Sequence, residues 1–158
     1  MREILFRAKR IDNGEWVEGF YSQLPKPSLG ATIITNGDLC AEDVSDYIIV
    51  NQCKQHSNFS NGYPLEVVEC EYYEIDSETL CQYTGLTDKN GKKIFIGDVI
   101  RCSRGCPHEV IWLKEYAGTY VGGMPAVYLS GLLKGYAWTG EEEKIGNIFD
   151  DPELLKGE

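Results

Sequence analysis

The sequence predicts a mainly β protein, and three observations carry this prediction. Ten tyrosines, three tryptophans and seventeen glycines favour strands and turns over helices. The pairs Asn13-Gly14 and Asn90-Gly91 lie between β-prone segments, which is among the strongest local signals for a hairpin. Apolar and polar residues alternate in segments beside these turns with the period of two that is typical of half-buried strands.

The N-terminal half is predicted to begin with a hairpin. Residues 4–10 and 15–21 form its arms, and Asp12-Asn13-Gly14 forms its turn. Residues 25–30 contain two prolines and predict a rigid connection in which a variable insertion could lie. Further strands are expected at 31–35, 47–51 and 65–75, with turns at 36–38 and 58–64 and a short turn or helical cap at 76–79.

The most informative segment spans residues 82–100. Asp88 to Gly91 predicts a tight turn, because Asn and Gly tolerate positive φ and Asp can accept hydrogen bonds from its own downstream backbone. Ile94, Ile96 and Val99 then indicate a half-buried strand. Gly97-Asp98 interrupts it, which predicts a bulge or bend that lets one strand serve two sides of a small barrel.

The C-terminal third is predicted to continue the sheet. Residues 108–114 carry apolar side chains on both faces, as a central strand does. Asp151 is expected to cap a short helix that has Pro152 at its first position, where a missing N–H costs nothing. Three further strands are predicted, at 119–124, 126–129 and 144–149.

Three blocks resemble the YopX family of phage and prophage proteins. They are the segment from Phe6 to Gly19, the segment from Gln82 to Val99, and the ending from Ile145 to Leu155. Ile96 departs from the pattern, because an acidic residue is more usual there. The resemblance marks these positions as a structural signature: Gln82, Tyr83, Thr84, Gly85, Leu86, Asp88, Asn90, Gly91, Gly97, Asp98, Gly146, Asn147 and Pro152.

The resemblance also implies an SH3-like barrel, self-association and a bacterial or phage origin, and it implies no catalytic residues. The expected organisation is a single unit over residues 1–158. Residues 1–75 would form an N-terminal β-rich lobe, with a β-hairpin and the variable insertion. Residues 76–158 would form the SH3-like barrel, followed by the short helical turn.

The charge of the chain argues against general binding to DNA or RNA. Fifteen basic and 25 acidic residues give a net charge of −10, whereas nucleic-acid affinity depends largely on Lys and Arg. Residues 55–88 contain seven acidic residues and no Lys or Arg. This pattern indicates a solvated face or a surface for a basic partner. An opposite, basic pole could support head-to-tail self-association, and it comprises Arg2, Arg7, Lys9 and Arg10.

Six cysteines occur, at positions 40, 53, 70, 81, 102 and 106. Cys102, Cys106 and His108 form a cluster with ligand-like spacing, and Cys53 with His56 could complete a four-ligand zinc site. A reactive thiol beside Arg101 and Arg104 is an alternative. The preferred interpretation is that the cysteines are reduced and structural or incidental, with no metal and no cofactor.

The remaining chemistry is sparse. The two histidines lie in no nucleophile motif, and no phosphate-binding loop occurs. We therefore expect a non-enzymatic protein-binding or assembly module of the bacterial cytoplasm, a homo-oligomer with a possible host or phage protein partner and no membrane association. A small zinc protein or hydrolase built on the Cys/His cluster, and a nucleic-acid-associated accessory protein, are the alternatives.

Overall fold

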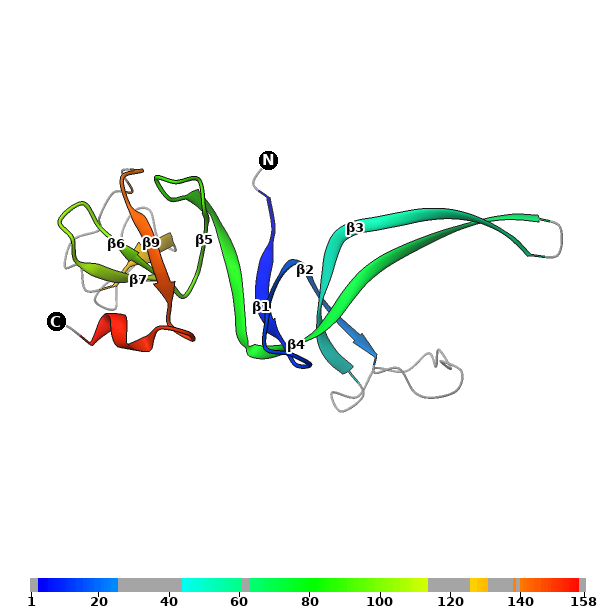
Figure 1. Ribbon diagram of the computed structural model, residues 1–158, viewed down its shortest axis with the longest axis horizontal. Helices are drawn as coiled ribbons and strands as arrows, with labels where there is room; N and C mark the ends of the chain where they lie inside the picture. Colours follow the sequence, from blue (N-terminus) through cyan, green and yellow to red (C-terminus); the bar gives the residue numbers. More distant parts are fainter. Residues whose placement is uncertain are drawn as a thin grey trace. The chain divides into compact units, whose positions relative to one another are not determined.

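The computed structural model describes residues 3–25, 44–60, 63–113, 126–130, 138 and 140–156. Within these ranges the chain forms nine β-strands and one short 3-10 helix (Figure 1), so the mainly β class is confirmed. Two compact units are present, and each is described separately. The N-terminal unit comprises Leu5–Leu80, and the C-terminal unit comprises Cys81–Glu158 with the first four residues. The described part of the chain has no helix with the length and apolar character needed to cross a membrane.

Strands β1 (Phe6–Arg10) and β2 (Trp16–Pro25) open the N-terminal unit as an antiparallel hairpin. The Arg10 N–H donates to the Glu15 carbonyl and the Arg10 carbonyl accepts from the Gly14 N–H, both at 3.0 Å. Gly14 has a φ of +72°, a left-handed conformation that costs glycine nothing. The predicted hairpin and its Asn-Gly turn are confirmed.

Strands β3 (Val44–Ser60) and β4 (Tyr63–Thr87) complete the sheet of this unit, in which β2 pairs with β3, β3 with β4, and β1 also with β4. A Cβ at Gly19 would lie 2.2 Å from the carbonyl oxygen of Ile49, so only glycine allows β2 to pass this close to β3. The core of the unit contains three buried residues: Ala8, Ile48 and Ile75.

The distal part of β3 and β4 is a two-stranded ribbon, which we define as residues 53–60 and 63–70. Its register runs without interruption from Cys53↔Cys70 to Ser60↔Tyr63. β2 pairs with β3 only over residues 44–49, and no other strand among the described residues pairs with the ribbon. Figure 1 shows the ribbon curving away from the rest of the N-terminal sheet.

Several predicted boundaries in this region were wrong. Residues 58–60 and 63–64 belong to strands rather than to a turn-rich loop, and residues 76–79 lie within β4. Asp76 nevertheless shows turn chemistry, since its side chain accepts the Glu78 N–H at 3.1 Å and its carbonyl accepts the Thr79 hydroxyl at 2.7 Å. The features predicted at 26–30, 31–35, 36–38 and 119–124 lie outside the described residues.

The C-terminal unit begins with a hairpin between the end of β4 and β5 (Lys93–Phe95). Asp88 organises its turn. One oxygen of the buried carboxylate accepts the backbone N–H groups of Asn90 and Lys92, both at 2.8 Å, and the other accepts the Lys144 N–H at 3.2 Å. Gly91, with a φ of +79°, donates its N–H to the Asp88 carbonyl. The predicted turn is confirmed.

The bend at Gly97-Asp98 is also confirmed. Gly97 has a φ of +82° and separates β5 from β6 (Asp98–Arg101). The carboxylate of Asp98 is completely buried. It accepts the Phe95 N–H at 2.8 Å and forms an ion pair with the Lys144 ammonium at 3.0 Å. This acid therefore fixes the strand on the two sides of the bend.

Four strands form the main sheet of this unit, in the order β8-β7-β6-β9. They are β7 (Pro107–Leu113), β8 (Ala126–Leu129) and β9 (Glu143–Asn147), with β6. β7 is the predicted central strand. Among the described residues no pairing joins β8 to β9, so the sheet is open and the expected barrel is not closed. The core of the unit contains Ile94, Ile100, Val110 and Leu129.

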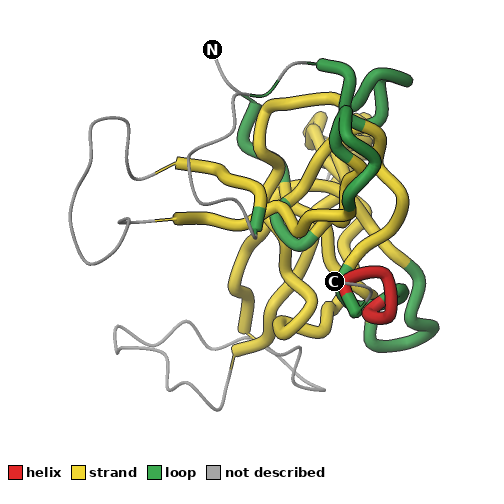
Figure 2. The backbone as a smooth tube through the Cα atoms, turned by 90° about the vertical axis from the view of Figure 1, so that its left-hand side faces the viewer, coloured by secondary structure: helices red, strands yellow, loops and turns green. Residues whose placement is uncertain are grey.

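The chain ends in a 3-10 helix, η2 (Pro152–Leu155), which Figure 2 shows beside the strands. Pro152 opens it as predicted. Asp151 precedes it, but its side chain makes no capping hydrogen bond and instead accepts the Asn147 N–H at 3.2 Å. A Cβ at Gly146 would lie 2.4 Å from that carboxylate, which explains the glycine. The predicted capping role of Asp151 was therefore wrong.

Candidate functional site

The thiol and imidazole groups singled out in the sequence lie together at the end of the β6–β7 hairpin. The Gly105 N–H donates to the Cys102 carbonyl at 2.9 Å, and the Cys102 N–H donates to the Cys106 carbonyl at 3.0 Å. Gly105 has a φ of +90°, so residues 103–105 form a three-residue loop whose last position is left-handed. Cys102 and Cys106 consequently face each other at the mouth of the hairpin.

His108 completes the cluster. It is the second residue of β7, which begins directly after Cys106. The ligand atoms of Cys102, Cys106 and His108 all lie within 4.8 Å of one another. Cys102 and His108 are buried, whereas Cys106 is exposed. The structure therefore brings together the three residues that the sequence indicated, with one of them open to solvent.

A hydrogen bond to Ser130 fixes the orientation of the His108 ring. Its Nδ1 lies 2.8 Å from the carbonyl oxygen of Ser130, and the Ser130 hydroxyl accepts the Glu109 N–H at 2.9 Å. A carbonyl oxygen can only accept, so Nδ1 donates this hydrogen bond and the ring presents Nε2 on its other side.

The environment of Cys102 favours the thiolate. Burial alone raises the pKa of a thiol, but the backbone N–H groups of Arg104 and Cys106, together with His108, outweigh burial and lower the pKa of Cys102. The side chain of Arg101 is exposed, as is that of Arg104. Sequence reasoning attributed thiol activation to these two arginine charges, whereas backbone donors and the imidazole cause it.

Cys102 also lines an open depression of about 370 Å³. Its rim carries both charge signs, because Lys89 forms an ion pair with Glu143 at 2.7 Å and Arg101 and Glu141 also line it. The ammonium of Lys89 lowers the pKa of Glu143. The site therefore has a polar approach from solvent.

The other predicted ligands are elsewhere in the chain. Cys53 and His56 belong to β3 of the N-terminal unit, and their side chains lie outside the described part of the structure, as do those of Cys40 and Cys70. Cys81 is buried in the C-terminal unit as a thiol. The described residues thus provide a three-ligand cluster and give no support to the four-ligand site predicted from Cys53 and His56.

Two residues of the predicted basic pole are held by neighbouring side chains. Arg7 is buried and lies over the Trp16 ring at 4.7 Å. Arg10 lies over the Tyr73 ring at 3.8 Å and donates its Nε–H to Asp12 at 2.9 Å. Arg2 lies outside the described residues. Aromatic rings and a neighbouring acid thus hold Arg7 and Arg10, and the head-to-tail association expected from charge stays a prediction.

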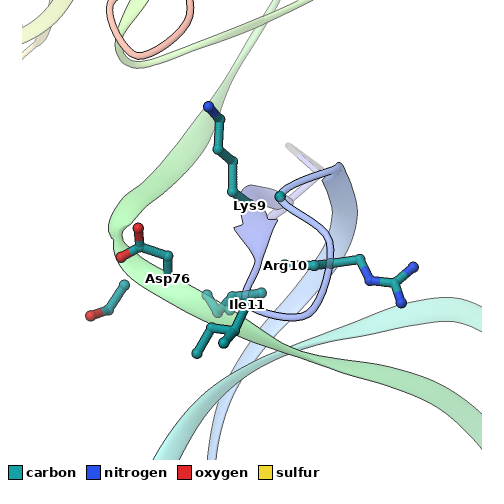
Figure 3. A pocket seen from close by; sticks show the side chains of 7 residues that line it. Lys9, Arg10, Ile11 and Asp76 are labelled. Atoms are coloured by element: carbon teal, nitrogen blue, oxygen red, sulfur yellow. The ribbon is translucent and has the colours of Figure 1, made fainter.

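Two depressions adjoin the β1–β2 hairpin of the N-terminal unit. Figure 3 shows the first, of about 400 Å³, with Lys9, Arg10, Ile11 and Asp76 on its walls. The second, of about 260 Å³, is lined by Ile11, Asp12, Tyr72, Tyr73 and Glu74. Ile11 is 60% exposed and Tyr72 is 56% exposed, so apolar side chains and acids share one surface. Sequence reasoning indicated an acidic surface for a basic partner but did not find Ile11.

The signature positions serve the fold. The Thr84 hydroxyl donates to the Ile94 carbonyl at 2.7 Å, and Asn147 accepts the backbone N–H groups of Phe149 and Asp150. The rings of Tyr83 and Phe95 are in contact, with centroids 5.5 Å apart. Gln82 accepts the Ile96 N–H through its carbonyl, Gly85 adopts a φ of +85°, and Leu86 packs on the core.

These observations define a class, a two-unit all-β protein with a turn-organising acidic signature and a thiol–imidazole cluster. The chain belongs to the YopX family, since the family model described as "YopX protein" matches residues 5–156. The crystal structure of protein EF1440 from Enterococcus faecalis is similar in fold, with a TM-score of 0.50, 23% sequence identity, and coverage of 98% of this chain and 99% of that chain. No curated protein sequence matches this chain.

Proposed function

We propose that this protein is a non-enzymatic assembly module that associates with further copies of itself through the β3–β4 ribbon. The observation that carries the proposal is the strand register. Eight successive pairs, from Cys53↔Cys70 to Ser60↔Tyr63, continue past the point at which β2 stops pairing with β3. The ribbon thus extends beyond the sheet that supports it.

A two-stranded ribbon is marginally stable in water, because it has two open edges and no layer to pack against. Its sequence nevertheless includes apolar residues, among them Phe59, Leu65, Val67 and Val68. Addition of a strand from another chain would satisfy the edge N–H and C=O groups. A second copy fits this role, since two identical edges can pair antiparallel about a two-fold axis.

The charge of the ribbon also supports pairing with a second copy of the chain. Lys54 is paired in register with Glu69, and Glu66 is the other acid of the ribbon, so the ribbon carries a net charge of −1 with His56 neutral. The chain as a whole carries −10. Repulsion between copies is therefore weak where strand addition would take place, and low net charge favours such pairing.

A ribbon-shortened variant tests the proposal. Because Cys53 and Cys70 are direct partners, residues 54–69 can be replaced by Asn-Gly to close a two-residue hairpin at that pair. We expect the full chain to be an oligomer by light scattering and the variant to be a folded monomer by light scattering and circular dichroism. Trp112→Ala, which removes a half-exposed aromatic of the C-terminal unit, is the matched control and should keep the oligomer.

A second surface supports a protein partner from the host or from a phage. Ile11 and Tyr72 are exposed in one depression whose acids are Asp12 and Glu74. Exposed aromatic and aliphatic groups within a polar rim are typical of binding hot spots, and the acids favour a segment with Lys or Arg beside an apolar anchor. Selection of displayed random peptides on the full chain should enrich such sequences. Tyr72→Ala should abolish the enrichment and Trp112→Ala should not, and a selection without basic, apolar peptides would contradict this surface.

We also infer an open SH3-like arrangement in the C-terminal unit. β5 pairs with β4 and, beyond the bend at Gly97, β6 pairs with β7 on one side and β9 on the other, which suits one bent strand that serves two small sheets. A cytoplasmic site of action and a phage or prophage origin complete the proposal. The thiols of Cys102 and Cys106 support a reducing compartment.

A further inference from the structure

The geometry points to a metal-binding site formed by Cys102, Cys106 and His108, for a borderline or soft divalent cation of which Zn²⁺ is the best fit. This inference goes beyond the proposed assembly function and concerns the other unit of the chain. Two sulfur ligands and one imidazole nitrogen form a donor set that zinc prefers over magnesium or calcium, which take oxygen ligands.

The spacing of the ligand atoms is close to what zinc requires. Bond lengths of about 2.3 Å to sulfur and about 2.0–2.1 Å to nitrogen place tetrahedral ligands roughly 3.6–3.8 Å apart. The three ligand atoms here already lie within 4.8 Å of one another. An inward shift of about 1 Å completes the geometry, and rotation of the exposed Cys106 side chain can supply most of it without moving the hairpin.

The surroundings prepare two of the three ligands. His108 donates its Nδ1–H to the Ser130 carbonyl, which leaves Nε2 as the ligand and provides the outer-shell hydrogen bond that metal-bound imidazoles generally make. The backbone N–H groups of Arg104 and Cys106 form hydrogen bonds with the Cys102 sulfur. Metal binding deprotonates both thiols, so the two sulfurs balance the charge of a divalent cation.

The fourth position of a tetrahedral ion would remain open. Cys106 is exposed, and Cys102 lines the depression that Glu141 and Glu143 also border. Water would therefore occupy that position, or a carboxylate could reach it from this side. Three protein ligands with an exchangeable fourth bind more weakly than a closed four-ligand structural site, so we expect a metal that chelators remove without unfolding the protein.

Cobalt titration of the full chain tests the site. The chelator-treated, reduced protein is titrated with Co²⁺ under anaerobic conditions, followed by Zn²⁺ competition. We expect one ion per chain, sulfur-to-cobalt charge-transfer absorption, the intense visible bands of tetrahedral cobalt, and displacement by Zn²⁺. Absence of charge-transfer absorption, or a Cys102–Cys106 disulfide that forms in preference to metal binding, would overturn the inference.

Variants separate this cluster from the other cysteines. Cys106→Ser changes an exposed side chain, so the fold should survive, and Co²⁺ affinity should fall by more than the roughly 10- to 100-fold typical of losing an outer-shell partner. Cys81→Ala, a buried thiol of the same unit, and a variant with Cys40, Cys53 and Cys70 all changed to Ser should keep the affinity of the parent chain. Unchanged binding in Cys106→Ser, or loss of binding in either control, would place the metal elsewhere.

Discussion

The N-terminal ribbon and the C-terminal signature use their backbone polar groups in opposite ways. In the signature, Asp88 and Asp98 are buried acids that accept backbone N–H groups from turns and neighbouring strands, and Asp98 also pairs with Lys144. In the ribbon, residues 53–60 and 63–70 pair only with each other among the described strands, so each strand keeps one open edge. The signature therefore stabilises the fold, whereas the ribbon is the segment for which we propose self-association.

The largest expected effect is at Asp98. Asp98→Ala removes the buried half of the ion pair with Lys144 and leaves the Phe95 N–H without its acceptor. We expect a loss of about 3–5 kcal/mol in the free energy of unfolding, as for other broken buried pairs. Glu143→Gln is the control, since it breaks the exposed pair with Lys89 in the same unit and should leave stability nearly unchanged. Chemical denaturation measures both, and equal losses would refute the structural role of the signature.

A pair of glycine variants applies the same comparison to the N-terminal unit. Gly19→Ala forces a Cβ against the Ile49 carbonyl, which should cost about 1–3 kcal/mol or displace β2 from β3. Gly14→Ala meets no neighbouring atom and carries only the left-handed backbone penalty of about 1–2 kcal/mol. Gly19→Ala should also weaken amide-exchange protection along β2 and β3, whereas Gly14→Ala should affect the turn alone. Identical protection in the two variants would show that the close approach is absent.

The dependence of the unfolding free energy on pH at the acid end should depend on Asp88. Burial raises the pKa of this carboxyl, but the N–H groups of Lys92, Lys144 and Asn90 outweigh burial, and its pKa is lower in the folded chain. Its contribution is thus complete above the unfolded-state pKa of about 3.9 and is lost as the pH falls through the lower folded-state pKa. Unfolding free energy measured against pH should fall less steeply on the acid side in Asp88→Asn. An unchanged slope would show that the carboxylate is not ionised in the turn.

The smallest expected effect concerns nucleic acid. The ribbon has Lys54 as its only Lys or Arg, and the buried Arg7 and paired Arg10 offer little positive surface. We expect no binding of duplex or single-stranded DNA at physiological ionic strength by fluorescence anisotropy. Binding that persists at that salt concentration would show that the ribbon is a nucleic-acid arm rather than an assembly element.

The parts of the fold that could be predicted depend on short-range chemistry. Asn13-Gly14, Asn90-Gly91 and Gly97-Asp98 were found because positive φ and Asp side-chain acceptance act within a few residues. The ribbon was predicted only in part, by the strand at 65–75, because Asn58 to Pro64 is rich in turn-forming residues, whereas pairing with the opposite strand decides the conformation of most of this segment.

The candidate metal cluster was predictable from the spacing of Cys102, Cys106 and His108, but the contact that orients His108 was not. The Ser130 carbonyl that orients His108 lies 22 residues away and is contributed by the residue after β8, so only the sheet brings it into place. The contact between Arg10 and Tyr73 was equally unpredictable, since it depends on the pairing of β1 with β4. Long-range strand pairing is what the sequence pattern does not specify.

The most direct test of the account is the molar mass of the full chain and of the ribbon-shortened variant by light scattering over a range of concentrations. The account predicts an oligomer for the full chain and a folded monomer for the variant that joins Cys53 to Cys70 through Asn-Gly, with Trp112→Ala matching the full chain. A monomeric full chain at every concentration, or a variant that keeps the oligomer, would contradict the claim that the ribbon assembles this protein.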